Sequence, residues 1–556
     1  MFYRSVRLSA LVASIYTCNI LELQTKCDKR EIVQDIDSIY NQFLMKTKTP
    51  GVIYAIVHDG KILHLKYQGY ANIEKDIKVE RDTRFRIASM SKSFTSLAIM
   101  KLSEEGKINL DDPIVKHIPM AIKKVSPNQQ DITVRDLLRM TPGLPQDDPW
   151  ADRCLHWSEE QLYNLLNSGK LIHSNKPGNV FEYSNLSYAI LGLLITKISG
   201  QPYQQYIRNN IFIPLHMNDT TFEYSDVPQN KLAQGYRFND VLQQYEPQPL
   251  LHDGIFGAMG GLVTTVDDYI KYVNFHQEAY ASDPNKVLRS IAKASTLLEM
   301  HRGHVFDNTL ENVKFDPSGN TVLSSVTEGP NKVETTIRIP PNMLFHRKCD
   351  KALDELSTRR FYGYGLRRDI IGDKFSVGHA GGIPGYGSEF RMYPKSKLSL
   401  ISFSNSTYGP CSRVHMILGQ TLIRQLENPN SSALDELSEE CDISGKEPCV
   451  TSIVAARAAE LKSIISLQKL SENSNIFAEN FYLDQNIEKW NKIISDSVAY
   501  LNGVDDNDSQ NPVGLTKINN LRGHFLIQGK NKKSLKVFFT LNPMGQIQHL
   551  NISVQE

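Results

Sequence analysis

Phe85-Arg86-Ile87-Ala88-Ser89-Met90-Ser91-Lys92 is a strand-like apolar run that leads into a helical pattern extending from Ser89 to about Glu105. Gly106 then provides a stop signal. Residues three apart lie close together on one side of a helix, so the Lys92 amine can reach the Ser89 hydroxyl. A serine needs an adjacent base to become a nucleophile, and the start of a helix favours developing negative charge. The octapeptide therefore predicts a serine nucleophile at position 89.

Tyr183-Ser184-Asn185 is the second candidate motif, and it follows Phe181-Glu182. Positive charge close to a phenol favours its anion, so a tyrosine near cations can act as general base and acid. An asparagine two residues later can hydrogen-bond both a lysine and a substrate carbonyl. The alternative is that Tyr183 is an ordinary core residue. Asn185-Leu186-Ser187 also matches a glycosylation triplet, which a catalytic Asn185 would leave unmodified.

His379-Ala380-Gly381-Gly382 is the third motif and follows a strand-like segment. Glycine after a strand suits a backbone that approaches a ligand closely and offers its N–H groups. The alternative interpretation is a tight hairpin that carries an incidental histidine.

In this order, Ser-x-x-Lys, Tyr-x-Asn and His-x-Gly resemble the serine β-lactamase and penicillin-binding-protein superfamily. The pattern is most similar to the class C β-lactamase branch with its esterase, D-aminopeptidase and animal lactamase-β-like relatives. The resemblance covers roughly residues 35–425, apart from most of an insertion. Further fragments that resemble the family are Thr133–Leu138, Met140–Leu144, Gly260–Thr265 and Tyr362–Leu366.

The resemblance implies a role for each motif residue. Ser89 would attack an acyl carbonyl, Lys92 and Tyr183 would share proton transfer, and Asn185 would hold Lys92 and the substrate. The N–H groups of Ser89 and Gly382 would form the oxyanion hole, and His379 would line the strand side of the cleft. The implied fold is α/β (α+β): an antiparallel sheet with helices on both faces and a helical subdomain.

Position 379 departs from the β-lactamases, which have lysine there. Lysine offers a permanent cation to a substrate carboxylate, whereas neutral histidine offers one donor and one acceptor. Histidine at this position resembles the esterase, aminopeptidase and animal branches. We therefore expect a hydrolase of small esters or amides rather than an efficient β-lactamase.

The 556 residues predict several segments. We expect a signal peptide at 1–25, a catalytic domain at 30–427 with an insertion at about 300–358, a linker at 428–448 and a small α+β unit at 449–556. Within them the pattern predicts a hairpin at 51–70, helices at 133–139, 186–198 and 267–276, three strands at 375–404, helices near 450–470 and 485–501, and strands near 523–529, 535–541 and 547–554.

The N-terminus indicates export. Arg4 and Arg7 precede an uncharged run from Leu8 to Leu21, which suits a signal peptide and is too short to span a membrane. Removing Cys18 would leave six cysteines, and Cys441 and Cys449 are close enough in sequence to close a small ring. Glycosylation triplets occur at Asn218, Asn405, Asn430, Asn507 and Asn551. These features favour a secreted or lumenal protein, and a mitochondrial presequence is the alternative.

The charge balance of the sequence bears on which kinds of partner the protein could bind. The 62 basic and 61 acidic residues leave a net charge of +1, which gives no sign of a nucleic-acid or membrane-surface partner. His301-x-x-His304 is the nearest approach to a metal motif, and without a third ligand we expect two surface residues and no cofactor. The rival to an active hydrolase is a catalytically inactive scaffold or binding protein of the same fold, with the C-terminal unit serving a protein partner.

Overall fold

A computed structural model gives the architecture of the chain. It describes residues 36–118, 131–239, 242–310, 358–371, 374–409 and 452–555, the last range with short gaps, and shorter pieces at 314–315, 320–323, 335–338 and within 411–423.

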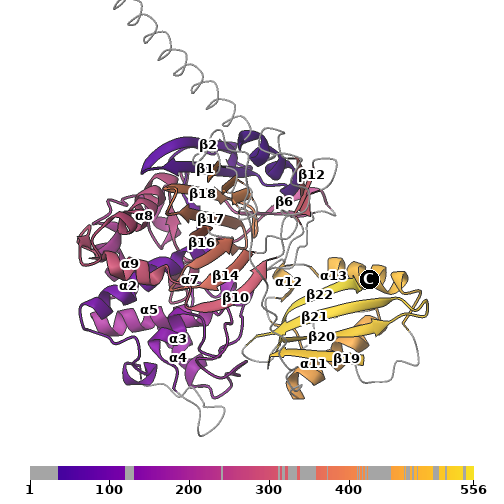
Figure 1. Ribbon diagram of the computed structural model, residues 1–556. Helices are drawn as coiled ribbons and strands as arrows, with labels where there is room; N and C mark the ends of the chain where they lie inside the picture. The colour runs from indigo at the N-terminus through magenta and orange to yellow at the C-terminus, as the bar shows by residue number, and fades with distance from the viewer. Residues whose placement is uncertain are drawn as a thin grey trace, which may run out of the picture.

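A nine-stranded sheet with antiparallel pairing organises the N-terminal part (Figure 1). Its strands, in spatial order, are β10 (Val305–Leu310), β14 (Thr358–Tyr362), β15 (Arg367–Ile371), β16 (Lys374–Ile383), β17 (Tyr386–Tyr393), β18 (Leu398–Ser404), β1 (Gly51–His58), β2 (Lys61–Asn72) and β3 (Ile77–Lys78). Two-stranded pairs join β4 (Phe85–Arg86) to β7 (Val263–Thr264), β5 (Tyr236–Asn239) to β6 (Gln244–Pro247) and β8 (Val287–Leu288) to β9 (Ala292–Lys293), while β11 (Lys314–Phe315), β12 (Asn320–Leu323) and β13 (Thr335–Arg338) form a small sheet. The predicted antiparallel sheet is confirmed.

Strand β1 shows why both faces of the sheet are covered. Its side chains alternate, and all but the last are buried. Ile53, Ala55 and Val57 join the large core under the main helices, whereas Val52, Tyr54 and Ile56 pack against the helix at residues 36–47. The predicted turn to β2 is present, with Asp59 and Gly60 at φ 47° and 76°, the conformation that a tight two-residue hairpin requires.

The helices confirm the α/β prediction. They are α2 (Lys92–Glu104), α3 (Val134–Leu138), α4 (Glu159–Asn167), α5 (Asn185–Ser199), α6 (Tyr203–Ile207), α7 (Gly257–Gly260), α8 (Val266–Glu278) and α9 (Ala294–Met300). Among the residues that the structure describes, no helix is both long and apolar enough to cross a membrane. Helix α5, buried along most of its length, packs on α2 and α7 and so lies beneath the candidate site.

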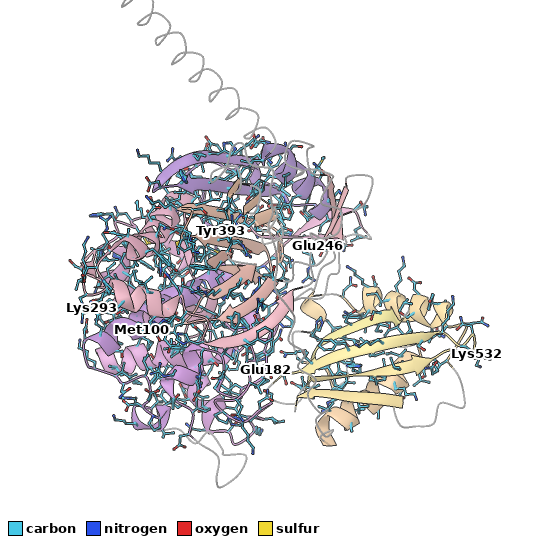
Figure 2. The ribbon with its side chains drawn as sticks, viewed as in Figure 1. Met100, Glu182, Glu246, Lys293, Tyr393 and Lys532 are labelled. Atoms are coloured by element: carbon cyan, nitrogen blue, oxygen red, sulfur yellow. The ribbon has the colours of Figure 1, made fainter. Side chains whose placement is uncertain are left out.

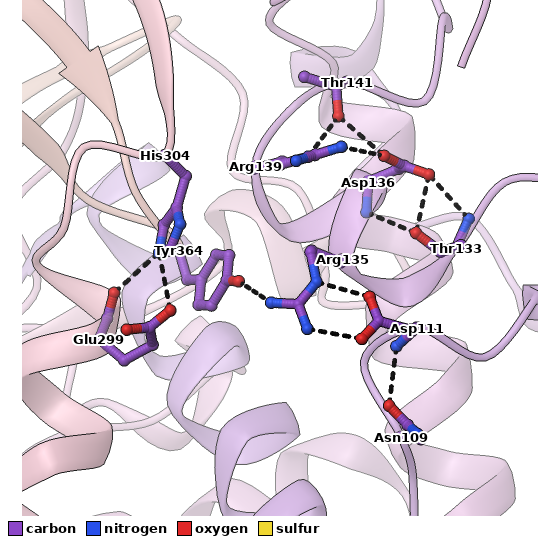
Figure 3. Close-up of polar contacts among 10 residues, drawn as sticks. All are labelled: Asn109, Asp111, Thr133, Arg135, Asp136, Arg139, Thr141, Glu299, His304 and Tyr364. Carbon is purple, nitrogen blue, oxygen red and sulfur yellow. Dashed lines mark hydrogen bonds and ion pairs between the residues drawn. The ribbon is translucent and has the colours of Figure 1, made fainter. Parts of the chain in front are cut away.

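Helix α3 joins two of the fragments that the sequence singled out (Figure 3). Thr133 caps the helix, and the Asp136 side chain accepts hydrogen bonds from the Thr133 backbone and hydroxyl at 3.1 and 2.7 Å. Arg135 pairs with Asp111 at 2.7 Å and donates to the Tyr364 hydroxyl at 2.5 Å. The segment before β15 is therefore tied to the helical side of the molecule.

The segment predicted as an insertion contributes to the main sheet. Strand β10 lies within residues 300–358 and pairs with β14. In the C-terminal part, helices α11 (Ser452–Ser466), α12 (Phe481–Asp484) and α13 (Ile487–Tyr500) accompany a four-stranded sheet of β19 (Val513–Asn519), β20 (Arg522–Gln528), β21 (Ser534–Leu541) and β22 (Ile547–Gln555). Sequence reasoning missed α12 and β19. These elements share a core of their own.

One buried side chain links the C-terminal sheet to the candidate site. Gln548 on β22 donates a hydrogen bond to the Gln146 carbonyl, and Ile172 packs against the C-terminal core. The Gln146 N–H in turn bonds the Glu182 carboxylate at 3.0 Å. Figure 2 labels Glu182 on the side of the N-terminal part that faces the yellow sheet.

One predicted glycosylation site needs correction, and several other predicted features lie outside the described residues. Asn405 is fully buried and donates to the carbonyls of Tyr70 and Gln234 at 2.9 Å each, so it is no glycosylation acceptor in the folded chain. Cys154 and Cys411 are buried free thiols. The predicted signal peptide, the linker, the other five cysteines and the triplets at positions 430 and 507 fall outside the described residues.

The prediction that His301 and His304 are surface residues is wrong. His301 is 1% exposed and shares a hydrogen bond of 2.8 Å with the equally buried His276. His304 stacks on Tyr364 at 4.1 Å and bonds the Glu299 carbonyl (Figure 3). No group of three or more metal-ligating side chains is found in the described part of the chain. Both histidines are used in packing.

The His276–His301 pair predicts a loss of stability in acid. Burial lowers the pKa of His276 to about 3 and that of His301 well below its usual value of 6.5. Both stay neutral when folded but take up protons when unfolded, so their contribution is complete above pH 6.5 and is lost as the pH falls below it. Each protonation costs about 1.4 kcal/mol per pH unit.

Denaturant titrations at a series of pH values below neutrality measure this slope. We expect His276→Gln to reduce the pH dependence of the free energy of unfolding by the equivalent of about one bound proton. His156→Gln, at an exposed position, is the matched control and should leave the slope unchanged. Equal slopes in the parent and His276→Gln would contradict the assignment.

Candidate active site

Ser89 lies where a short 3-10 turn, Ala88–Ser91, passes into α2. Ala88 holds a left-handed conformation at φ 47°, which an alanine adopts only when its surroundings impose it. The turn follows β4 and packs under β16. Ser89 is 9% exposed, and it is thus presented from a constrained turn rather than from a regular helix.

Lys92 joins the first two motifs. Its ammonium is fully buried and donates to Ser89 Oγ at 2.9 Å, Asn185 Oδ1 at 2.7 Å and the Met259 carbonyl at 2.9 Å. Burial lowers its pKa to about 8, although Asp148, Asp152 and Asp147 favour the charged form. A lysine with this pKa is partly neutral near physiological pH, and the neutral amine can accept the Ser89 proton.

Asn185 is fixed by two aspartates that sequence reasoning missed. Asn185 is the first residue of α5, and its N–H and that of Leu186 donate to the two carboxylate oxygens of Asp147 at 2.8 Å each. Its side-chain amide donates to Asp148 at 2.5 Å, which leaves Oδ1 turned toward Lys92. The signal in the sequence was an acidic pair between two prolines, at 145–149, directly after the matched fragment Met140–Leu144.

Tyr183 lies between the lysine and the strand side of the site. Its ring centre is 4.9 Å from Lys92 Nζ, 6.2 Å from the Tyr362 ring and 6.1 Å from the His379 ring. The adjacent Glu182 carboxylate is held by the Gln146 N–H and by the Asn175 amide at 2.9 Å. The structure thus brings the predicted Ser89, Lys92, Tyr183, Asn185 and His379 together.

His379 lies on β16 and is 2% exposed. Its Nδ1 is 2.5 Å from the Ala380 carbonyl, which can only accept, so Nδ1 carries the proton. Nε2 therefore accepts from the Tyr362 hydroxyl at 3.2 Å. Burial, followed by the charges of Arg367 and Lys92, holds the pKa of His379 well below its usual range. The imidazole is therefore neutral at neutral pH.

The two glycines of the third motif permit close packing. A Cβ on Gly381 would lie 2.2 Å from the Ile87 carbonyl, so this position lets β16 rest on the turn that carries Ser89. A Cβ on Gly382 would lie 2.8 Å from the Tyr408 ring, whose hydroxyl donates to Asp152 at 2.6 Å. The predicted oxyanion residue Gly382 therefore lies beside a bridge from the sheet to the helical side.

The site thus places a serine hydroxyl beside a buried lysine amine, with an asparagine bonded to the lysine and a tyrosine ring near it. The "Beta-lactamase" family model matches residues 36–329, more than half of the chain. The protein belongs to this family and so to the serine β-lactamase and penicillin-binding-protein superfamily.

Similar proteins cover part or most of the chain. Protein flp of Staphylococcus aureus is 38% identical over 209 residues, which are 36% of this chain and 41% of that protein. Beta-lactamase-like protein 4 of Dictyostelium discoideum is 31% identical over 279 residues, 46% of this chain and 48% of that one. The chain thus spans less than half the length of these curated relatives.

Solved structures support the fold. The octameric penicillin-binding protein homologue from Pyrococcus abyssi aligns with a TM-score of 0.54 at 21% identity, over 94% of this chain and 98% of that one. The penicillin binding protein from Bacillus halodurans gives 0.50 at 20% identity, over 69% and 99%. At these identities the likeness concerns the fold alone.

Removing Asp147 should loosen the site and the start of α5 together. Asp147→Ala leaves two buried N–H groups without acceptors, so we expect the free energy of unfolding to fall by about 2–4 kcal/mol. Chemical denaturation measures this loss. Asp226→Ala, at an exposed aspartate, is the control, and an equal effect of both variants would contradict the capping role.

The buried lysine also predicts a pH dependence. The fraction of neutral Lys92 rises as the pH passes its pKa of about 8. We therefore expect the rate at which a fluorophosphonate labels Ser89 to rise with pH, with its midpoint near 8. A rate that does not change from about pH 6 to about pH 10 would show that Lys92 is not the base.

Proposed function

We propose that the protein hydrolyses small esters or amides through an acyl-enzyme on Ser89. Membership of a serine hydrolase superfamily supports a hydrolase in general. The observation that carries the finer proposal is the buried Lys92 amine, which lies 2.9 Å from Ser89 Oγ and is held in place by Asn185.

In the first half of the reaction, neutral Lys92 accepts the Ser89 proton as Oγ attacks the carbonyl carbon. The N–H groups of Ser89 and Gly382 stabilise the negative charge that forms on the carbonyl oxygen. The bond to the leaving group then breaks, and the leaving group takes a proton from Lys92 by way of Tyr183. An acyl group remains on Ser89 Oγ.

In the second half, water attacks the acyl carbon and gives its proton to the same two residues. The ester bond to Ser89 breaks, Oγ regains a proton, and the acid product leaves. Lys92 and Tyr183 act in both halves, so each is of little use without the other.

The state of His379 favours neutral substrates. A buried, neutral imidazole whose Nδ1 proton is bound by Ala380 and whose Nε2 accepts from Tyr362 has nothing to offer a substrate carboxylate. Position 379 thus lacks the lysine that β-lactamases have there, which supports ester or amide substrates. The nearby cation on the neighbouring strand, Arg367, lies against the Tyr183 ring.

Mutation of the motif residues tests the proposal against an inactive scaffold. We expect Ser89→Ala to lower kcat by about a thousandfold or more, Tyr183→Phe to cost a large part of the same amount, and the double variant to add little. The measurement is turnover of an ester panel and a chromogenic cephalosporin.

Labelling by a fluorophosphonate, followed by peptide mapping, provides the control. Ser91 should remain unlabelled, because its hydroxyl donates to the Ala88 carbonyl and accepts from the Leu262 N–H. Ser91→Ala should therefore still be labelled at residue 89. Equal trace hydrolysis in the parent and Ser89→Ala, together with an unlabelled Ser89, would favour the scaffold.

A further inference from the structure

We propose that Arg367 supplies the permanent positive charge on the strand side of the site and acts as a positioning residue through Tyr183, where His379 carries none. The inference rests on the proposed function. Arg367 belongs to none of the three motifs, so the site gains a positively charged residue in addition to Lys92.

The fold brings Arg367 to this place. It is the first residue of β15 and pairs with Gly378, the residue before His379 on β16. Its guanidinium carbon lies 5.7 Å from the centre of the Tyr183 ring, within the range in which a cation is attracted to an aromatic face. The residue is 8% exposed, so water screens its charge little.

Arg367 affects two other groups of the site. Burial is the main cause of the lowered pKa values of His379 and Lys92, and the charge of Arg367 lowers both further. A guanidinium stays protonated throughout the working range of pH. The cation is therefore permanent, as the lysine of β-lactamases is, but it comes from the neighbouring strand.

Residues from four elements surround the Tyr183 ring, and two of them carry a charge. Lys92 lies on α2, Tyr362 on β14, Arg367 on β15 and His379 on β16. On the helical side the carboxylates of Asp147, Asp148 and Asp152 act on Lys92, and on the sheet side Asp307 of β10 approaches Arg367 at 3.9 Å. Among the described residues, Arg367 and protonated Lys92 are the cations against the Tyr183 ring, and each stabilises negative charge that forms on the tyrosine oxygen.

The pH profile of kcat/KM separates this role from simple packing. Arg367→Gln removes a cation, so the group that must lose a proton, whether Lys92 or Tyr183, holds it more tightly. We expect the acid limb to move up by about one pH unit. Arg367→Lys should restore it, and Asp307→Asn, which removes the opposing carboxylate, should move it the other way.

Two comparisons guard against a folding defect. The double variant Arg367→Gln/Asp307→Asn removes both members of a buried ion pair, which is less damaging than removing one. We expect its limb to lie between those of the single variants. His379→Gln exchanges one neutral side chain for another, so its limb should stay at the parent's pH whatever happens to the rate.

The outcomes are distinct. If the acid limb of the kcat/KM profile does not move in Arg367→Gln, or if Arg367→Lys behaves like Arg367→Gln, the role of Arg367 is overturned. Ester turnover by the parent would still support the proposed function. If the parent turns over none of the esters, the pH dependence of the rate of fluorophosphonate labelling at Ser89 is measured in place of the pH profile of kcat/KM. Absence of both in the parent overturns the proposed function, and the role of Arg367 with it.

Discussion

The buried ammonium of Lys92 is the constraint on which the rest of the site depends. A charged amine without exposure to water has to be surrounded by acceptors, and here three parts of the chain provide them: the turn at Ser89, the start of α5 at Asn185 and the carbonyl of Met259 in α7. Each acceptor is itself fixed, Asn185 most firmly, because Asp147 and Asp148 hold its backbone and its amide. Burial and the nearby carboxylates act on the lysine in opposite directions, and the resulting pKa of about 8 is one that a general base needs.

The helical side and the sheet side of the fold present different charges to the site. The helical side presents carboxylates to the lysine, from Asp147, Asp148 and Asp152, and so favours its charged form. The sheet side presents the cation of Arg367 and a histidine that burial keeps neutral. The Tyr183 ring lies between them, 4.9 Å from Lys92 Nζ and 5.7 Å from the Arg367 guanidinium carbon. Tyr408 bridges the halves beside Gly382 through its bond to Asp152.

Local patterns predicted much of this, and long-range contacts account for what was missed. The sequence predicted Ser-x-x-Lys, the helix now seen as α5 and the three strands at 375–404, because helix and strand periodicity and turn residues are local properties. Asp147 and Arg367 were not singled out, since their importance comes from residues 38 or more positions away or on another strand. The burial of His301 and Asn405 was hidden for the same reason: a histidine pair and a buried amide are made by tertiary contacts, not by spacing.

His379 and Arg367 are best understood as one feature. A lysine at position 379 would place a third buried cation beside Arg367 and Lys92, with Asp307 already approaching Arg367. Like charges in a poorly screened site repel strongly, and the most readily neutralised of the three is Lys92, whose pKa is already lowered. A histidine avoids this, because it can stay neutral while bonding Tyr362 and Ala380. A neutral histidine on β16 is therefore compatible with a permanent cation on β15, because among the described residues only Lys92 and Arg367 then place positive charge against the Tyr183 ring.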